Sequence, residues 1–221
     1  MTCLLSASIL SANFATLGKE CEDVLKAGAD RIHFDVMDNH YVPNLTIGPL
    51  VCQALRNYGI KAEIDVHLMT QPVDRLIEDF AKAGASVITF HPEATDNITH
   101  SLSLIKKHHC KAGLAFNPTT SLHYLDNHKD QLDEILIMSV NPGFAGQAFI
   151  PESIDKIKLA KNMIHEHKKN IAIAVDGGIK LDNIDKVAKA GATIFVAGSA
   201  IFKTKNYKTT INAFRKALLA G

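Results

Sequence analysis

Lys26-Ala-Gly-Ala-Asp-Arg-Ile-His-Phe-Asp-Val36 joins the end of a helical pattern to a short, strongly apolar segment. The same phrase returns as Lys82-Ala-Gly-Ala-Ser86 and as Lys189-Ala-Gly-Ala-Thr193, each time before another apolar segment. Each copy fits a helix end, a glycine able to adopt the left-handed conformation after the helix, and then a buried strand. The copies lie 56 and 107 residues apart. These distances correspond to two and four units of about 27–28 residues, the size of one strand–helix repeat.

Filling the gaps between these phrases predicts eight strands that alternate with eight helices. The predicted strands cover residues 4–8, 31–36, 62–68, 86–90, 111–116, 134–140, 171–176 and 193–197, and the predicted helices cover residues 14–27, 48–58, 72–83, 97–108, 121–128, 151–167, 182–190 and 207–219. Strands that are almost continuously apolar are typical of a parallel sheet covered on both faces.

No linker rich in proline, glycine or serine divides the chain. We therefore expect residues 1–221 to form one α/β domain, a single (β/α)₈ (TIM) barrel. A doubly wound open sheet is the alternative, but eight evenly spaced units without a dinucleotide-binding fingerprint favour a closed barrel.

Composition limits the compartment and the partners that we expect for this chain. The formal net charge of +1 supplies no strong field for nucleic acid or an anionic membrane, and no apolar run approaches the roughly 18 residues of a membrane span. The apolar segment Met1–Leu10 lacks a basic flank and is interrupted by serines, so it predicts a strand rather than a signal peptide. Four scattered cysteines without a CxxC pair are typical of reduced thiols. We expect a cytoplasmic protein without a nucleic-acid or membrane partner.

Polar side chains gather where the predicted strands end, which is where barrel enzymes carry their active sites. His33 and Asp35 lie two positions apart on one strand and therefore share a face. With His67 and Asp176 from two other strands, they could converge on one divalent ion. Two nitrogen and two oxygen ligands suit Zn²⁺, Fe²⁺, Mn²⁺ or Co²⁺ better than Ca²⁺ or Mg²⁺. A single strand-end histidine is more often structural, so the prediction depends on all four residues together.

Glycine-rich turns follow the last three predicted strands, as Asn141-Pro-Gly-Phe-Ala-Gly-Gln147, Asp176-Gly-Gly-Ile179 and Ala197-Gly-Ser-Ala200. Glycines let backbone N–H groups approach a phosphate closely, and this fold often binds phosphate after its seventh and eighth strands. One such turn is weak evidence, but three in succession predict a phosphate site. Near the same end lie three methionines, which either pack flexibly or present polarisable sulfur to a substrate: Met37, Met69 and Met138.

Several of these segments together resemble the ribulose-phosphate 3-epimerase family, in order and spacing over nearly the whole chain. The segments are Ser6-Ala-Ser-Ile-Leu-Ser11, Ile32-His-Phe-Asp-Val-Met-Asp-Asn-His-Tyr-Val-Pro-Asn44, Val66-His-Leu-Met69, Phe90-His-Pro-Glu-Ala94, Asn141-Pro-Gly-Phe-Ala-Gly-Gln147, Val175-Asp-Gly-Gly-Ile179 and Ala197-Gly-Ser-Ala-Ile-Phe202. The resemblance implies a homo-oligomeric isomerase of the pentose phosphate pathway. Such an enzyme interconverts D-ribulose 5-phosphate and D-xylulose 5-phosphate through an enediolate, with one divalent metal ion and no organic cofactor.

The resemblance also implies a role for each matching residue. His33, Asp35, His67 and Asp176 would bind the metal, and Asp35 and Asp176 would also form the acid–base pair. Residues expected to contact the sugar are Ser8, His67, Met37, Met69 and Met138, and those expected to hold the phosphate are Gly143, Phe144, Ala145, Gly146, Gly177, Gly178, Gly198 and Ser199. The acid–base roles agree with the chemistry, since inverting a carbon beside a ketone needs a proton removed from one face and returned to the other.

The chain departs from the family pattern at three places. Ala7 replaces a common proline, Ala145 replaces a common glycine, and Asn39 stands where glycine is usual, although asparagine tolerates a left-handed backbone.

Other functions stay open at the level of sequence. The nearest is 3-epimerisation of a six-carbon ketose phosphate such as allulose 6-phosphate. A second is another phosphate-binding barrel, such as a decarboxylase or an enzyme of indole or thiamin synthesis, which we would not expect to carry the His33, Asp35 and His67 set. A third is a non-catalytic barrel that binds metal or phosphate.

Overall fold

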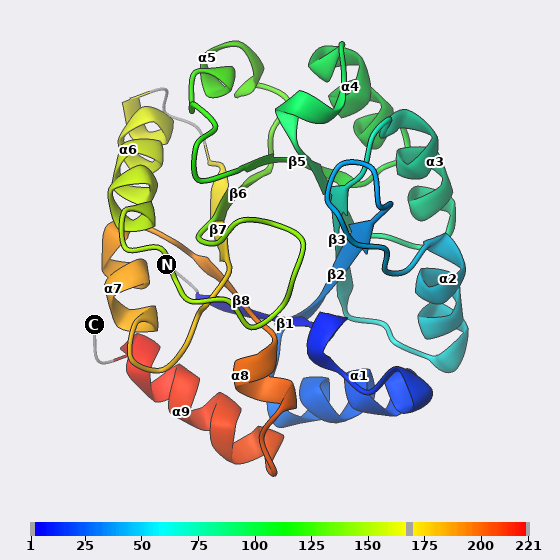
Figure 1. Ribbon diagram of the computed structural model, residues 1–221, viewed down its shortest axis with the longest axis vertical. Helices are drawn as coiled ribbons and strands as arrows, with labels where there is room; N and C mark the ends of the chain where they lie inside the picture. The colour runs from blue at the N-terminus through cyan, green and yellow to red at the C-terminus, as the bar shows by residue number, and fades with distance from the viewer. Residues whose placement is uncertain (1–2, 167–169, 220–221) are drawn as a thin grey trace.

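The computed structural model describes residues 3–166 and 170–219 and shows a closed barrel of eight parallel strands (Figure 1). The strands follow one another around the barrel in chain order, and β8 pairs with β1 to close it. They are β1 (Leu4–Ser8), β2 (Arg31–Met37), β3 (Glu63–Met69), β4 (Val87–Phe90), β5 (Lys111–Phe116), β6 (Glu134–Met138), β7 (Ala172–Asp176) and β8 (Ile194–Ala197). The predicted (β/α)₈ barrel is confirmed.

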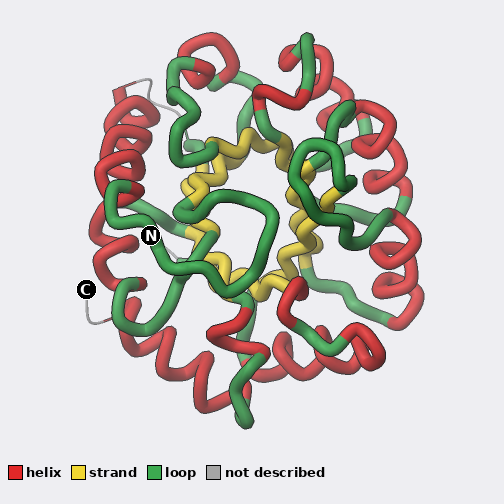
Figure 2. Tube along the Cα trace, viewed as in Figure 1, coloured by secondary structure: helices red, strands yellow, loops and turns green. Residues whose placement is uncertain are grey.

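Helices surround the ring of strands on the outside (Figure 2). They are α1 (Leu17–Ala27), α2 (Pro49–Tyr58), α3 (Asp74–Lys82), α4 (Ile98–Lys107), α5 (Tyr124–His128), α6 (Ser153–Glu166), α7 (Ile184–Ala190), α8 (Ser199–Phe202) and α9 (Tyr207–Leu219). Three short 3₁₀ turns, at Ile9–Ser11, Phe14–Thr16 and Pro92–Ala94, follow strands or precede α1. Residue 167, the predicted end of the sixth helix, lies outside the described residues. Within the described ranges, no helix is long and apolar enough to cross a membrane.

The repeated phrase ends its helices as the sequence predicted. Gly28 follows α1 with a φ of 113°, and its N–H donates to the carbonyl oxygen of Leu25. Gly191 follows α7 with a φ of 127°. Positive φ costs little only for glycine, so each helix stops there and the chain turns into the next strand.

The strands bury both of their faces, which produces two layers of core. The outer layer lies between strands and helices and includes Phe34 of β2, whose ring meets Phe80 of α3 edge-on at 5.6 Å between centroids. The inner layer fills the barrel with smaller apolar side chains such as Ala115, Leu136 and Ala174. Because side chains alternate along a strand, His33 and Asp35 on either side of Phe34 point into the barrel. The fold therefore places these two polar side chains toward the barrel axis.

The segment between β6 and α6 crosses in front of the barrel opening in the view of Figure 1. Gln147 braces it by donating from Nε2 to the carbonyl oxygens of Asn141 and Phe144, at 2.6 and 2.9 Å. Four cysteines are present as free thiols, as predicted: Cys3, Cys21, Cys52 and Cys110.

Candidate active site

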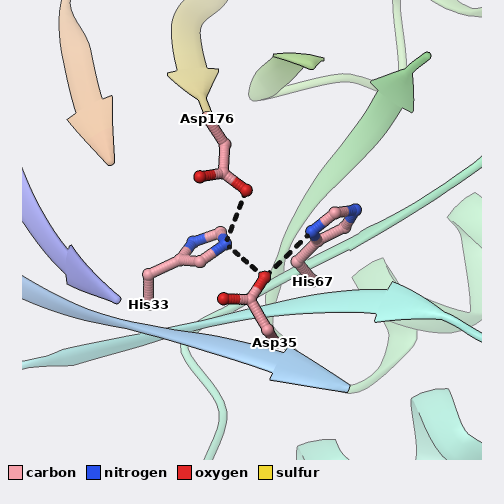
Figure 3. A group of neighbouring side chains, drawn as sticks. All are labelled: His33, Asp35, His67 and Asp176. Carbon is pink, nitrogen blue, oxygen red and sulfur yellow. Dashed lines mark hydrogen bonds and ion pairs between the residues drawn. The ribbon is translucent and has the colours of Figure 1, made fainter. Parts of the chain in front are cut away.

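Two histidines and two aspartates meet at the carboxyl ends of three strands (Figure 3). His33 and Asp35 come from β2, His67 from β3 and Asp176 from the end of β7. One nitrogen or oxygen atom from each lies within 4.8 Å of the corresponding atoms of the others. Nε2 of His33 is 3.2 Å from Oδ1 of Asp35 and 3.8 Å from Oδ2 of Asp176, and Nδ1 of His67 is 3.3 Å from Oδ1 of Asp35. The structure thus gathers all four predicted ligands.

The cluster is compatible with a divalent metal ion. Nε2 of His33 is buried and has no hydrogen-bond partner among the described residues, although it faces two carboxylates. A buried polar atom without a partner is costly, and a bound ion would supply one. The donor set of two imidazoles and two carboxylates suits a first-row transition metal or zinc.

Burial and close charges push the pKa values of the two aspartates in opposite directions. Burial raises the pKa of Asp176 to about 7, and the nearby carboxylate of Asp35 adds to this rise. Burial would also raise the pKa of Asp35, but the imidazoles of His33 and His67 hold it far below its usual range. Two carboxyl groups with separated pKa values suit one proton donor and one proton acceptor.

The two histidines of the cluster also differ. Burial would lower the pKa of His33, but the carboxylates of Asp35 and Asp65 raise it well above its ordinary value. Burial lowers the pKa of His67, and its hydrogen bond to Asp35 only partly opposes this. The Asp35 carboxylate therefore lies between one histidine whose pKa is raised and one whose pKa is lowered.

A cavity opens above the cluster. Fourteen of the predicted site residues line it: Ser8, Asp35, Met37, Met69, Met138, Gly143, Phe144, Ala145, Gly146, Asp176, Gly177, Gly178, Gly198 and Ser199. His33 and His67 are fully buried and are not among the lining residues, so contact between His67 and a sugar stays a prediction. Ser8 reaches the cluster directly, because its hydroxyl donates to Oδ2 of Asp35 at 2.7 Å.

Tight packing beneath the turn after β7 leaves no room for side chains at Gly177 and Gly178. A Cβ atom on Gly177 would lie 2.5 Å from Cγ2 of Val140, and one on Gly178 would lie 2.8 Å from Cα of Phe149. Both glycines have positive φ, 116° and 65°. Glycine is therefore required at both positions, and the turn can bring its backbone close to a bound anion.

The departure at Asn39 is accommodated as the sequence indicated. Its φ is 57°, in the left-handed region where asparagine is tolerated. Asp38 fixes the same turn, since its Oδ1 accepts from the backbone N–H groups of His40 and Tyr41 at 2.8 and 2.9 Å.

Sequence reasoning missed some of the cavity wall. The additional lining residues are Leu10, Ser11, Val140, Pro142, Gln147, Ile179, Lys180 and Val196. Lys180 is exposed and lies two residues after Gly178, so it places a positive charge at the predicted phosphate end. A lysine close to a glycine pair carries little signal by itself, because exposed lysines are common at turns.

Fold and site together define a class: a (β/α)₈ barrel enzyme with a buried cluster of two histidines and two aspartates at the carboxyl ends of its strands. Solved structures of similar fold include 3-keto-L-gulonate-6-phosphate decarboxylase from Vibrio cholerae O1 biovar El Tor str. N16961. It has a TM-score of 0.77 and 15% identity, with 100% of this chain and 99% of that chain covered. Another is 3-hexulose-6-phosphate synthase from Salmonella typhimurium, with a TM-score of 0.73, 17% identity, and coverage of 98% and 99%. At such identities the likeness supports the fold alone.

Sequence comparison is more specific. The model of the Ribulose-phosphate 3 epimerase family matches residues 4–202. Ribulose-phosphate 3-epimerase from Serratia marcescens is 60% identical over 93% of this chain and 98% of its own length. Ribulose-phosphate 3-epimerase from Escherichia coli (strain K12) is 59% identical over 97% of this chain and 96% of its own length. The chain belongs to the ribulose-phosphate 3-epimerase family.

Proposed function

We propose that this chain is an isomerase that interconverts D-ribulose 5-phosphate and D-xylulose 5-phosphate, a step of the pentose phosphate pathway. The observation that carries the proposal is the meeting of Asp35 and Asp176, from β2 and β7, in one cavity with pKa values shifted in opposite directions. The high identity to relatives named ribulose-phosphate 3-epimerase supports the substrate.

The reaction breaks the C3–H bond and reforms it on the other face. Asp35 takes the proton from C3. The electron pair of that bond forms a C2=C3 double bond while the carbonyl oxygen on C2 takes up the negative charge, which gives the enediolate. Asp176 donates a proton to the opposite face of C3, and the two residues exchange roles in the reverse direction. Because two separate groups act, the configuration inverts.

The metal ligands would be His33, Asp35, His67 and Asp176. When bound, Zn²⁺, Fe²⁺, Mn²⁺ or Co²⁺ would offset the negative charge that develops on the two enediolate oxygens. No organic cofactor is needed, because the ketone at C2 of the substrate itself takes up the electron pair released at C3. Ser8 and the three cavity methionines would contact the sugar, and His67 would adjoin it.

The phosphate would lie against the turns that contain Gly143 to Gly146, Gly177, Gly178, Gly198 and Ser199. Positive φ at Gly143 and Gly146, and the tight packing at Gly177 and Gly178, support this end of the cavity. Lys180 would add a positive charge to the same end.

The remaining features belong to the same proposal. Residues 1–221 would form one catalytic domain, which acts in the cytoplasm as a homo-oligomer and binds no nucleic acid. The near-neutral net charge supports the absence of a nucleic-acid partner, and the four free thiols support the cytoplasm.

A coupled assay tests the function. Protein loaded with Co²⁺ is incubated with ribulose 5-phosphate, and xylulose 5-phosphate is measured with and without a chelator. We expect rapid conversion that the chelator abolishes. Allulose 6-phosphate serves as the second substrate, and conversion of that sugar alone would move the assignment to the six-carbon enzyme. Conversion of neither sugar by the metal-loaded protein would refute the proposal.

A further inference from the structure

Each histidine of the cluster has one nitrogen that faces the cluster and one that is held from outside it. Nδ1 of His33 lies 2.7 Å from Oδ2 of Asp65, and Nε2 of His67 lies 2.8 Å from Nε2 of His91. Asp65 is 1% exposed and His91 is fully buried. Neither residue is among those that line the substrate cavity.

When Nε2 of His33 and Nδ1 of His67 bind an ion, these outer contacts hold the hydrogen on the other nitrogen of each ring. A carboxylate only accepts hydrogen bonds, so Asp65 requires an N–H at Nδ1 of His33 and leaves the Nε2 lone pair to the cluster when the ring is neutral. Nδ1 of His67 lies 3.3 Å from the Asp35 carboxylate, which would take a hydrogen from it in the absence of metal. With Nδ1 bound to an ion, the hydrogen of a neutral His67 lies on Nε2 and points to Nε2 of His91. The two ligand histidines would then use different nitrogens.

Asp65 is itself held firmly. Nη2 of Arg31 lies 2.9 Å from its Oδ2, and Arg31 binds both carboxylate oxygens of Glu134 at 2.8 Å each. All three side chains are at most 4% exposed. A bidentate pair of this kind limits rotation of the guanidinium, so the carboxylate that orients His33 cannot swing away.

His91 is held by packing rather than by charge. Its ring lies against that of Tyr41, with centroids 4.9 Å apart and planes at 30°. The hydroxyl of Tyr41 in turn accepts from Nδ2 of Asn117 at 2.8 Å. This stack, from Asn117 to Tyr41 to His91, restricts the direction from which His91 can meet His67.

We propose that Asp65 and His91 are positioning residues for the metal site, which direct Nε2 of His33 and Nδ1 of His67 toward a bound ion. The inference rests on the proposed function, because that function makes His33 and His67 ligands. Outer partners of ligand histidines commonly set ring orientation, and their loss weakens metal binding by about 10–100-fold.

Nitrogen NMR of the zinc-loaded protein tests the geometry directly. In long-range ¹H–¹⁵N correlation spectra, we expect His33 to carry its hydrogen on Nδ1 and His67 to carry its hydrogen on Nε2. Assignment uses the loss of each signal in His33→Gln and His67→Gln variants. The opposite tautomer at either ring would overturn the proposal.

Binding of Co²⁺ alone, followed by visible absorption, tests the energetic role. We expect His91→Leu and Asp65→Asn each to weaken Co²⁺ binding by about 10–100-fold, with KM for ribulose 5-phosphate within about twofold of wild type at saturating metal. His91→Gln keeps an acceptor near the position of Nε2 and should recover most of the affinity.

The outcomes separate the two proposals. If wild-type protein binds no Co²⁺, the metal role in the proposed function fails and this inference fails with it. If wild type binds Co²⁺ but His91→Leu and Asp65→Asn bind it equally well, only the positioning role is wrong. If Asp65→Asn does not fold, because Arg31 loses a partner, the His91 pair of variants still decides the result.

Discussion

Alanine at Gly178 would test how rigidly the turn after β7 is packed. At a φ of 65°, alanine enters the left-handed region, which costs about 1–2 kcal/mol. Its Cβ would also lie 2.8 Å from Cα of Phe149 and 3.0 Å from the carbonyl carbon of Ala148, and these are backbone atoms that cannot rotate away. Overpacking of this kind costs about 1–3 kcal/mol. The lower entropy of the unfolded chain returns about 0.4–1 kcal/mol.

The net expectation for Gly178→Ala is a loss of about 2–4 kcal/mol in the free energy of unfolding. Gly59→Ala is the matched control, since its φ is 110° and no heavy atom lies within 4 Å of the added Cβ. We expect that control to lose only about 1 kcal/mol. Urea denaturation of both variants, at saturating metal, measures the difference.

Gly178→Ala should also raise KM for ribulose 5-phosphate, because the shifted backbone belongs to the predicted phosphate end of the cavity. Gly59→Ala should leave KM unchanged. Equal losses of stability in the two variants would refute the argument, since they would show that the segment around Phe149 yields without cost.

Two further predictions concern stability. Lys156 donates to the carbonyl oxygens of Asn117 and Thr120, at 2.5 Å each. Lys156→Met should therefore lower the free energy of unfolding by about 2 kcal/mol. Lys158→Met is the control: it removes one exposed ion pair with Asp155 and should change the free energy of unfolding by less than about 0.5 kcal/mol. Similar losses in urea melts would contradict this. A separate prediction concerns the pH dependence of stability in metal-stripped protein. The pKa of Asp176 is raised from 3.8 to about 7, so the native state keeps a proton that the unfolded chain releases. The free energy of unfolding should therefore fall as pH rises from about 4 to 7, and the raised pKa of His33 acts in the same direction above pH 6.5. Thermal melts across this range should show a smaller slope for Asp176→Asn, and an unchanged slope would count against the assignment.

Much of the fold could be predicted because its signals are local. Each repeated phrase contains its own helix stop, and each strand is a short apolar run with polar ends, so the observed strands agree with the predicted ones within two residues at each end. The short helix α8 was missed, because four residues are too few to show a helical period. The predicted helix at 121–128 begins instead at Tyr124, after a turn that the sequence pattern does not distinguish from helix.

The candidate site could be predicted only in its inner part. The spacing of His33 and Asp35 places them on one face by strand geometry alone. The outer contacts needed the tertiary structure, since Arg31 and Glu134 begin strands β2 and β6, which are not neighbours in the barrel. At a strand start they would be expected to be solvated, yet both are buried. The contact between His67 and His91 depends on ring orientation, which no sequence pattern specifies.

The central claim is that Asp35 and Asp176 move the C3 proton from opposite faces. Metal-loaded wild-type, Asp35→Asn and Asp176→Asn proteins are incubated in deuterated water, separately with ribulose 5-phosphate and with xylulose 5-phosphate, and label at C3 is followed together with epimerisation. The account predicts that both variants lose epimerisation by at least about 100-fold, and that Asp176→Asn still exchanges the C3 proton of ribulose 5-phosphate, which Asp35 removes. Exchange at the wild-type rate in Asp35→Asn from ribulose 5-phosphate would contradict the account.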